Sequence, residues 1–175
     1  MSDHLLHLYT GDGKGKTTAA MGMALRMLGH EKPVLIAQFM KDGTSGELKS
    51  LARFENAHIF EGARMKGFIW HMTPPQLEEA RQAYREAAES LLDTIHKLSP
   101  ALTVLDELCV ALAARLLSQE DAFRVIDAAL LYGDTVVTGR YAPDKLQERA
   151  DYVSRIEAVK HPFNEGQRAR EGIEW

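Results

Sequence analysis

A glycine-rich segment near the amino terminus constrains the fold more than any other part of this sequence. Residues 10–18 read TGDGKGKTT, after an apolar run over 5–9 and before a helical pattern over 19–28. This order of strand, loop and helix is the setting of a phosphate-binding loop, whose usual pattern is G-x-x-x-x-G-K-[ST]. The first position is Thr10 instead of glycine, and the loop carries a second lysine, Lys14. The alternative, a glycine- and lysine-rich surface turn, is disfavoured by this context.

The residue types in this loop suit contact with a polyphosphate. Glycines let the backbone curl so that its N–H groups face phosphate oxygens, and the helix that follows adds the positive end of its dipole. Lys16 supplies a charge for the phosphates and Thr17 a hydroxyl for Mg²⁺, and these two are the predicted catalytic residues. The predicted nucleotide-binding residues of the loop are Gly11, Asp12, Gly13, Lys14, Gly15, Lys16, Thr17 and Thr18.

Length, net charge and cysteine content limit the number of domains and the classes of protein to consider. The 175 residues predict one domain over 1–175, and the net charge of −4 argues against binding to nucleic acid through bulk positive charge. A single cysteine, Cys109, excludes an intrachain disulfide framework and a multi-cysteine metal site. It lies in an apolar run and is expected to be buried; a reactive thiol is the alternative. We find no signal segment and no apolar run of about 18 residues, so we expect a cytoplasmic protein without a membrane span.

Strand and helix patterns alternate along the chain. The predicted strands are 5–9, 34–39, 57–60, a buried strand within 101–108, 134–140 and an edge-type strand over 152–159. The predicted helices begin near residues 16, 73, 118 and 143. Continuous apolar runs such as 34–39 are typical of strands covered on both faces. The sequence therefore predicts an α/β fold of the phosphate-loop NTPase-like (RecA-like) type, with a mostly parallel central sheet and helices on both faces.

Polar side chains stand where the predicted strands end. In a parallel sheet these ends meet at one edge, where ligands bind. Gln38, Lys41 and Arg140 are therefore predicted to bind the nucleotide, and Asp106 and Glu107 to contact Mg²⁺ directly or through water. The alternatives are a solvated lysine, a surface salt bridge of the arginine and a surface turn containing the two carboxylates.

Two further segments bear on the site. Within 61–72, Phe68 and Trp70 are two residues apart and share a side if the segment is extended, so they could stack on a flat ligand. From the residues alone, packing of these two side chains in the core or between subunits is the favoured interpretation.

Residues 160–175 form a C-terminal tail without clear periodicity. We expect this tail to fold over the site or over a second subunit, and we do not predict that His161 binds metal.

These features together resemble one family, the phosphate-loop ATP:corrinoid adenosyltransferases that act on cob(I)alamin and on precursors such as cob(I)yrinic acid a,c-diamide. The resemblance extends from Tyr9 to Trp175 and depends on residues 9–20, 38–41, 67–70, 104–108, 138–140, 160–163 and 172–174. It implies a homodimer that uses ATP with Mg²⁺ and transfers the 5′-deoxyadenosyl group to Co(I), releasing triphosphate. It also implies that Phe68 and Trp70 lie against the corrinoid, which replaces the packing interpretation.

The resemblance has further consequences. A flavoprotein that reduces Co(II) is an expected partner, and the pathway is adenosylcobalamin biosynthesis or salvage. Some members carry an extension before the first strand; few residues precede Leu5 here, so a covering role is expected to be absent or supplied elsewhere. Two other classes remain open: a phosphate-loop NTPase or nucleotide kinase, and a module that senses ATP or a corrinoid without turnover.

Overall fold

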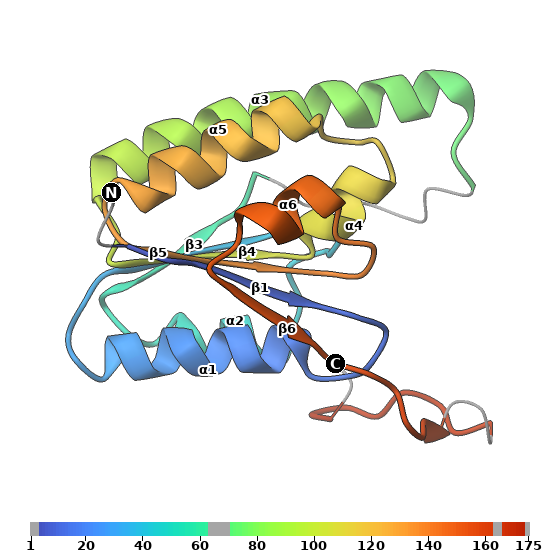
Figure 1. Ribbon diagram of the computed structural model, residues 1–175, viewed down its shortest axis with the longest axis horizontal. Helices are drawn as coiled ribbons and strands as arrows, with labels where there is room; N and C mark the ends of the chain where they lie inside the picture. The colour runs from blue at the N-terminus through green and yellow to red at the C-terminus, as the bar shows by residue number, and fades with distance from the viewer. Residues whose placement is uncertain (1–3, 63–70, 163–165, 174–175) are drawn as a thin grey trace.

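One parallel sheet organises the molecule. The computed structural model describes residues 4–62, 71–162 and 166–173. Every strand in these residues belongs to the same sheet, in the order β3-β2-β4-β5-β1-β6, and every neighbouring pair is parallel (Figure 1). This confirms the predicted α/β fold. The strands are β1 (Leu6–Thr10), β2 (Val34–Gln38), β3 (Ala57–Phe60), β4 (Leu102–Asp106), β5 (Asp134–Thr138) and β6 (Tyr152–Arg155).

Helices cover both faces of the sheet, as predicted (Figure 1). One face carries α1 (Lys16–Leu28) and α2 (Gly46–Leu51), and the other carries α3 (Pro74–Leu98), α4 (Leu108–Ala113), α5 (Gln119–Leu130) and α6 (Asp144–Arg149). Within the described ranges, no helix combines the length and the apolar character needed to cross a membrane.

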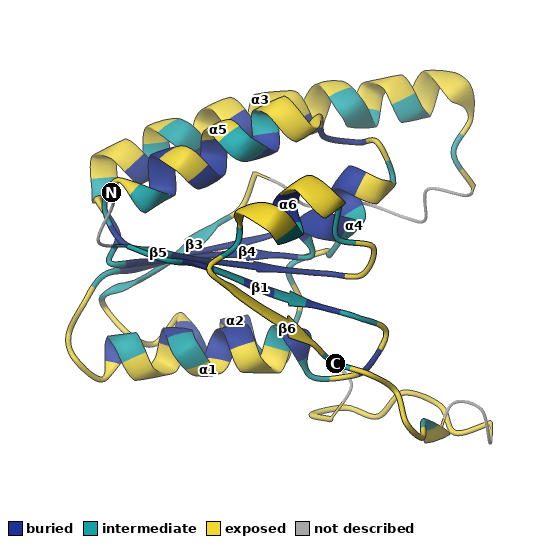
Figure 2. Cartoon of the chain, viewed as in Figure 1, coloured by how far each residue is buried: buried dark blue, intermediate teal, exposed yellow. Residues whose placement is uncertain are grey.

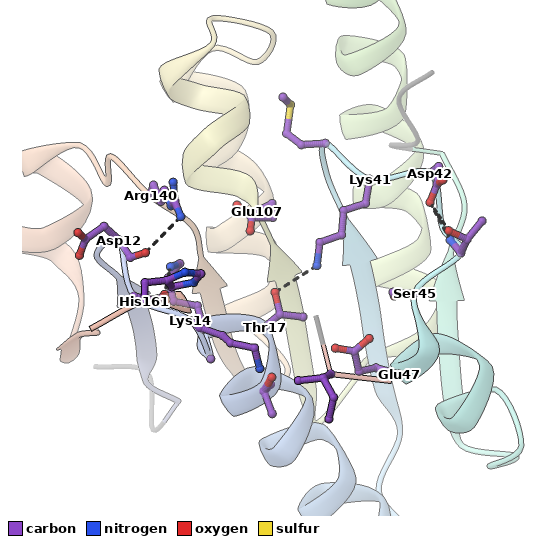
Figure 3. A pocket seen from close by; sticks show the side chains of 17 residues that line it. Asp12, Lys14, Thr17, Lys41, Asp42, Ser45, Glu47, Glu107, Arg140 and His161 are labelled. Atoms are coloured by element: carbon purple, nitrogen blue, oxygen red, sulfur yellow. Dashed lines mark hydrogen bonds between the residues drawn. The ribbon is translucent and has the colours of Figure 1, made fainter. Parts of the chain in front are cut away.

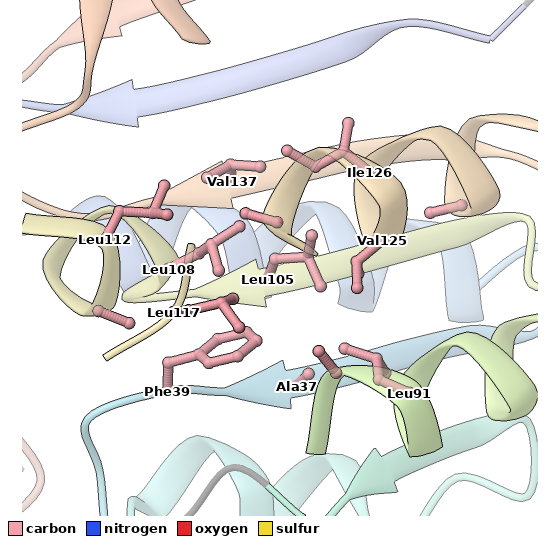
Figure 4. Packing of buried hydrophobic residues seen from close by; sticks show 14 of the residues in the cluster. Ala37, Phe39, Leu91, Leu105, Leu108, Leu112, Leu117, Val125, Ile126 and Val137 are labelled. Carbon is pink, nitrogen blue, oxygen red and sulfur yellow. The ribbon is translucent and has the colours of Figure 1, made fainter. Parts of the chain in front are cut away.

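The core has two layers because the central strands bury both of their faces (Figure 2). Side chains alternate along a strand, so Leu35 and Ala37 of β2 pack toward α3 and α5, whereas Val34 and Ile36 pack toward α1. Figure 4 shows the layer between the sheet and the helices α3 and α5, in which Leu105 and Val137 of the sheet pack near Leu91 of α3 and Ile126 of α5. Burial on both faces explains why these strands read as continuous apolar runs.

Local sequence signals account for the helix starts. Thr73 and Gln76 form a capping box at α3, in which the Thr73 N–H donates to Gln76 Oε1 at 2.8 Å. At α5, the Asp121 N–H donates to Ser118 Oγ at 3.0 Å. Both starts agree with the helices predicted to begin near 73 and 118.

Two short helices and the end of the last strand differ from the prediction, whereas the interpretation of Cys109 is confirmed. Helices α2 and α4 have six residues each, too few for a helical period to be recognised. The last strand ends at Arg155 instead of extending to residue 159, because the next residues turn to support the glycine-rich loop. Cys109 lies buried in α4, and burial raises the pKa of its thiol to about 12, which confirms the structural interpretation of this cysteine.

Candidate functional site

A cleft of about 900 Å³ opens at the carboxyl edge of the sheet (Figure 3). Its floor is the glycine-rich loop, residues 10–18, between β1 and α1, and its walls come from the loops after β2, β4 and β5. Those three loops contribute Lys41, Glu107 and Arg140. Strands far apart in the sequence thus deliver their terminal side chains to one place, as expected for a parallel sheet.

The glycine-rich loop is shaped by glycines and supported by the chain after β6. Gly11 has φ 100° and Gly15, the residue before α1, has φ 115°, both in the left-handed region that favours glycine. The Gly13 N–H donates to the Ile156 carbonyl at 2.8 Å. A Cβ on Gly13 would lie 2.7 Å from the backbone of Glu157, and one on Gly11 would collide with the Ile156 carbonyl. The loop therefore requires glycine at Gly11 and Gly13 for packing, and at Gly11 and Gly15 for its turns.

Cationic side chains line the cleft around this loop. Lys16 is only 7% exposed, and its Nζ donates to the Gly13 carbonyl at 2.6 Å. Burial lowers the pKa of Lys16, and the nearby Glu107 carboxylate partly opposes that effect. Arg140 donates through Nη2 to the Asp12 carbonyl at 3.2 Å, and Lys14 and Lys41 also face the cleft (Figure 3). Such a cluster suits a ligand with several negative charges.

Asp106 is the most heavily bonded of the predicted site residues. Its carboxylate is fully buried, and each oxygen accepts two hydrogen bonds. Oδ1 accepts from Thr17 Oγ1 at 2.8 Å and from Thr138 Oγ1 at 2.7 Å. Oδ2 accepts from Gln38 Nε2 at 3.0 Å and from Lys41 Nζ at 2.7 Å. This arrangement, named here the Asp106 network, joins β2, β4 and β5 to the start of α1.

Glu107 differs from its neighbour because it lines the cleft. It has φ 60° and immediately precedes α4, and its N–H donates to Thr138 Oγ1 at 2.9 Å. Burial raises the pKa of Glu107, and the adjacent Asp106 raises it further, whereas Lys41 and Lys16 lower it. The two adjacent acids are thus placed differently: one is enclosed in hydrogen bonds and the other faces the ligand space.

The donor set of this site fits Mg²⁺. Oxygen ligands are what Mg²⁺ prefers, and it usually combines one or two protein oxygens with waters and substrate phosphates. Thr17 gives its own proton to Asp106, so its Oγ1 can accept from a cation, and Lys41 Nζ donates to it at 3.1 Å. Within the described residues, no group of three or more His, Cys, Asp or Glu side chains is arranged to hold a metal. A metal here would depend on Thr17, Asp106 or Glu107 together with the phosphates.

Most of the predicted site residues converge, with some differences in role. Asp12–Thr18, Lys41, Glu107 and Arg140 line the cleft, whereas Gln38 is buried beneath it and bonds to Asp106. Phe68 and Trp70 lie outside the described residues, so their role stays a prediction.

Several residues of the site were not predicted. Thr138 bonds to both acids, and its position at the end of β5 was the available signal. Met40, Asp42, Thr44, Ser45 and Glu47 line the cleft in the loop after β2 and the start of α2. From the C-terminal tail, His161 and Ile173 line the cleft; whether the tail covers the site or a second subunit stays a prediction.

Comparisons with known proteins agree with this geometry. A family model described as ATP:corrinoid adenosyltransferase BtuR/CobO/CobP matches residues 2–175. The chain is 35% identical over 174 residues to a corrinoid adenosyltransferase of Pseudomonas aeruginosa, covering 98% of this chain and 83% of that protein. It is 34% identical over 176 residues to the Escherichia coli K12 corrinoid adenosyltransferase, covering 98% and 85%. It is also 34% identical over 180 residues to corrinoid adenosyltransferase CobA of Salmonella typhimurium, with 98% and 85% covered. The chain is therefore an enzyme of the transferase class and belongs to the ATP:corrinoid adenosyltransferase family.

Proposed function

We propose that this enzyme transfers the 5′-deoxyadenosyl group of ATP to the Co(I) ion of a corrinoid and releases triphosphate, in adenosylcobalamin biosynthesis or salvage. One observation supports the proposal above all others. Four cations, Lys14, Lys16, Lys41 and Arg140, line the same cleft as the glycine-rich loop. A triphosphate carries a comparable number of negative charges and is the leaving group of this reaction.

The reaction needs no base from the protein. Co(I) supplies an electron pair that forms the Co–C bond at C5′ of ATP, while the C5′–O bond breaks and its electron pair leaves on the triphosphate oxygen. Lys14, Lys16 and the backbone N–H groups of the glycine-rich loop would stabilise the charge that grows on this leaving group. Bound Mg²⁺, held by Thr17 with Asp106 or Glu107 nearby, would supply further positive charge to the phosphates. The chain's own contribution is thus orientation and electrostatic stabilisation.

The corrinoid contact rests on the family resemblance. Phe68 and Trp70 are proposed to present an apolar surface that keeps an axial position of cobalt free of water, which eases reduction of Co(II) to Co(I). Replacing either by alanine should then reduce activity more in an assay that starts from Co(II) than in one that starts from Co(I); equal losses would contradict this role.

The homodimer is also proposed from the family resemblance and can be tested by light scattering during size-exclusion chromatography. A reducing flavoprotein partner is tested by whether a purified reduced flavoprotein supports turnover from Co(II).

The products of ATP consumption test the proposal. The protein is incubated with ATP, Mg²⁺ and cob(I)alamin without oxygen, the phosphates are separated, and the corrinoid spectrum is followed. We expect tripolyphosphate in amounts equal to a light-sensitive adenosylated corrinoid. Lys16→Ala should abolish this conversion, whereas Lys49→Ala, which changes an exposed lysine of α2, should not.

Two other results would reject the proposal. Release of ADP without change of the corrinoid would indicate an NTPase or kinase. Tight binding of both ligands without ATP consumption would indicate a sensor.

A further inference from the structure

The ammonium group of Lys41 lies between two of the oxygens that are candidates for binding the metal. Its Nζ donates to Asp106 Oδ2 at 2.7 Å and to Thr17 Oγ1 at 3.1 Å (Figure 3 shows the contact with Thr17). The preceding residue, Met40, has φ 58°, and its N–H donates to the Tyr84 hydroxyl at 3.0 Å. The chain is therefore fixed just before Lys41 and directs this side chain back toward the end of β4.

Lys41 is the charged partner of a carboxylate that water does not reach. Asp106 is fully buried, and its other hydrogen-bond donors, Thr17, Thr138 and Gln38, are neutral. A buried carboxylate without a cation is strongly destabilising. The Lys41 side chain is 28% exposed and lines the cleft, so it can leave Asp106 without unfolding the surrounding structure.

A second cation would compete with Lys41 for the same oxygens. Thr17 Oγ1 uses its proton on Asp106 Oδ1 and accepts from Lys41, and both Asp106 oxygens already accept two hydrogen bonds. A Mg²⁺ ion bound to Thr17 Oγ1 would share that oxygen with an ammonium group, and the two cations would repel each other at short range. Lys41 and the metal therefore compete at this oxygen.

We propose that Lys41 is a substitute cation, which occupies the metal's place in the nucleotide-free protein and moves to the polyphosphate when Mg²⁺ enters with ATP. The proposal rests on the proposed function, because it takes the ligand to be ATP with Mg²⁺. It assigns to Lys41 a positioning role: its charge holds Asp106 and Thr17 in place until the metal arrives.

One consequence is that nucleotide and metal bind cooperatively. Without phosphates, a metal must displace Lys41 within a cleft whose carboxylates are already matched by other cations: Asp12, Asp42, Glu47 and Glu107 line it together with Lys14, Lys16 and Arg140. With phosphates, the displaced ammonium gains an anionic partner, so each ligand improves the binding of the other. The cooperativity should depend on the charge at position 41 more than on the total charge of the cleft.

Binding of Mn²⁺, followed by electron paramagnetic resonance without any corrinoid, tests this inference. Lys41→Met removes the charge at similar length, and Lys14→Met removes a charge from the same cleft without touching Thr17 or Asp106. Without nucleotide, we expect Lys41→Met to bind Mn²⁺ at least tenfold more tightly than the unmodified protein, and Lys14→Met to differ by less than about threefold. Addition of β,γ-imido-ATP should tighten Mn²⁺ binding much less in Lys41→Met than in the unmodified protein.

Lys41→Gln serves as the second variant, because its amide still donates to Asp106 and preserves folding if Lys41→Met does not fold. It should also bind Mn²⁺ more tightly. Unchanged Mn²⁺ affinity in a folded Lys41 variant, or an equal gain in Lys14→Met, would overturn the inference. Neither outcome depends on which products ATP yields, so failure of this inference and failure of the proposed function are distinguishable.

Discussion

Replacing Asp106 with asparagine exchanges one carboxylate oxygen for an NH₂ group, removes the negative charge and leaves two donors of the Asp106 network without an acceptor. The carboxylate accepts from four donors, two on each oxygen. An asparagine amide has one acceptor oxygen and one NH₂ group, so it cannot accept on both sides. Its oxygen would face Lys41 and Gln38, and its NH₂ group would face the hydroxyls of Thr17 and Thr138, whose protons would lose their acceptor.

The size of the effect follows from burial and charge. Breaking a fully buried ion pair costs about 3–5 kcal/mol because one charge is left uncompensated. Here the charge left behind belongs to Lys41, which is 28% exposed and can reach water. The two hydroxyls add a loss of about 1 kcal/mol each if their protons find no other acceptor. We therefore expect Asp106→Asn to lower the free energy of unfolding by about 2–4 kcal/mol.

Urea unfolding followed by circular dichroism measures this change without nucleotide or metal. Glu47→Gln is the matched control, since it removes a carboxylate charge from the cleft wall outside the Asp106 network. We expect this control to lie within about 0.5 kcal/mol of the unmodified protein. A loss below about 1 kcal/mol in Asp106→Asn would refute the reasoning, because it would mean that the network contributes little to the stability of the fold.

Three other changes test separate parts of the site. Gly11→Ala should weaken ATP binding at least tenfold in a calorimetric titration, because its Cβ would collide with the Ile156 carbonyl. Gly22→Ala in α1, where a Cβ meets nothing within 4 Å, should leave ATP binding unchanged. Lys16→Met should weaken ATP binding by about tenfold or more. It should not lower the thermal stability of the ligand-free protein. Burial depresses the pKa of Lys16, so the charged form opposes folding at pH values below the ordinary pKa of lysine, and a clear loss of stability would contradict this. Cys109 should resist iodoacetamide at pH 8 until the protein unfolds, because its pKa of about 12 leaves almost no thiolate; rapid labelling of the folded protein would contradict its burial.

The fold could be predicted because its signals are local. Each buried strand is a short apolar run, and the helix starts carry their own capping residues, as at Thr73 and Ser118. The convergence of Lys41, Asp106 and Arg140 could also be anticipated, because parallel strands end at the same edge of a sheet. None of these inferences requires knowing which strands are neighbours.

The remaining features depend on contacts between distant parts of the chain. The glycine-rich loop is supported by Ile156, which follows β6, and the direction of Lys41 is set by Tyr84 from the middle of α3. Thr138 joins the Asp106 network only because β5 lies beside β4 in the sheet. Such contacts depend on the order of the strands in the sheet and on the packing of the helices, and no local pattern in the sequence specifies either.

The charge distribution links the stability of the site to its proposed task. The chain has a net charge of −4, yet the cleft gathers Lys14, Lys16, Lys41 and Arg140 around one loop. The pKa of Lys16 is lowered chiefly by burial and to a smaller extent by Arg140, so its charge is held at a cost that the carboxylates of Glu107, Asp12 and Asp106 only partly offset. A polyanion bound beside Lys16 would supply a further counter-charge and offset this cost, which favours its binding. The same cations then face negative charge that increases as a triphosphate leaves, and their effect is therefore larger for the departing group than for bound ATP.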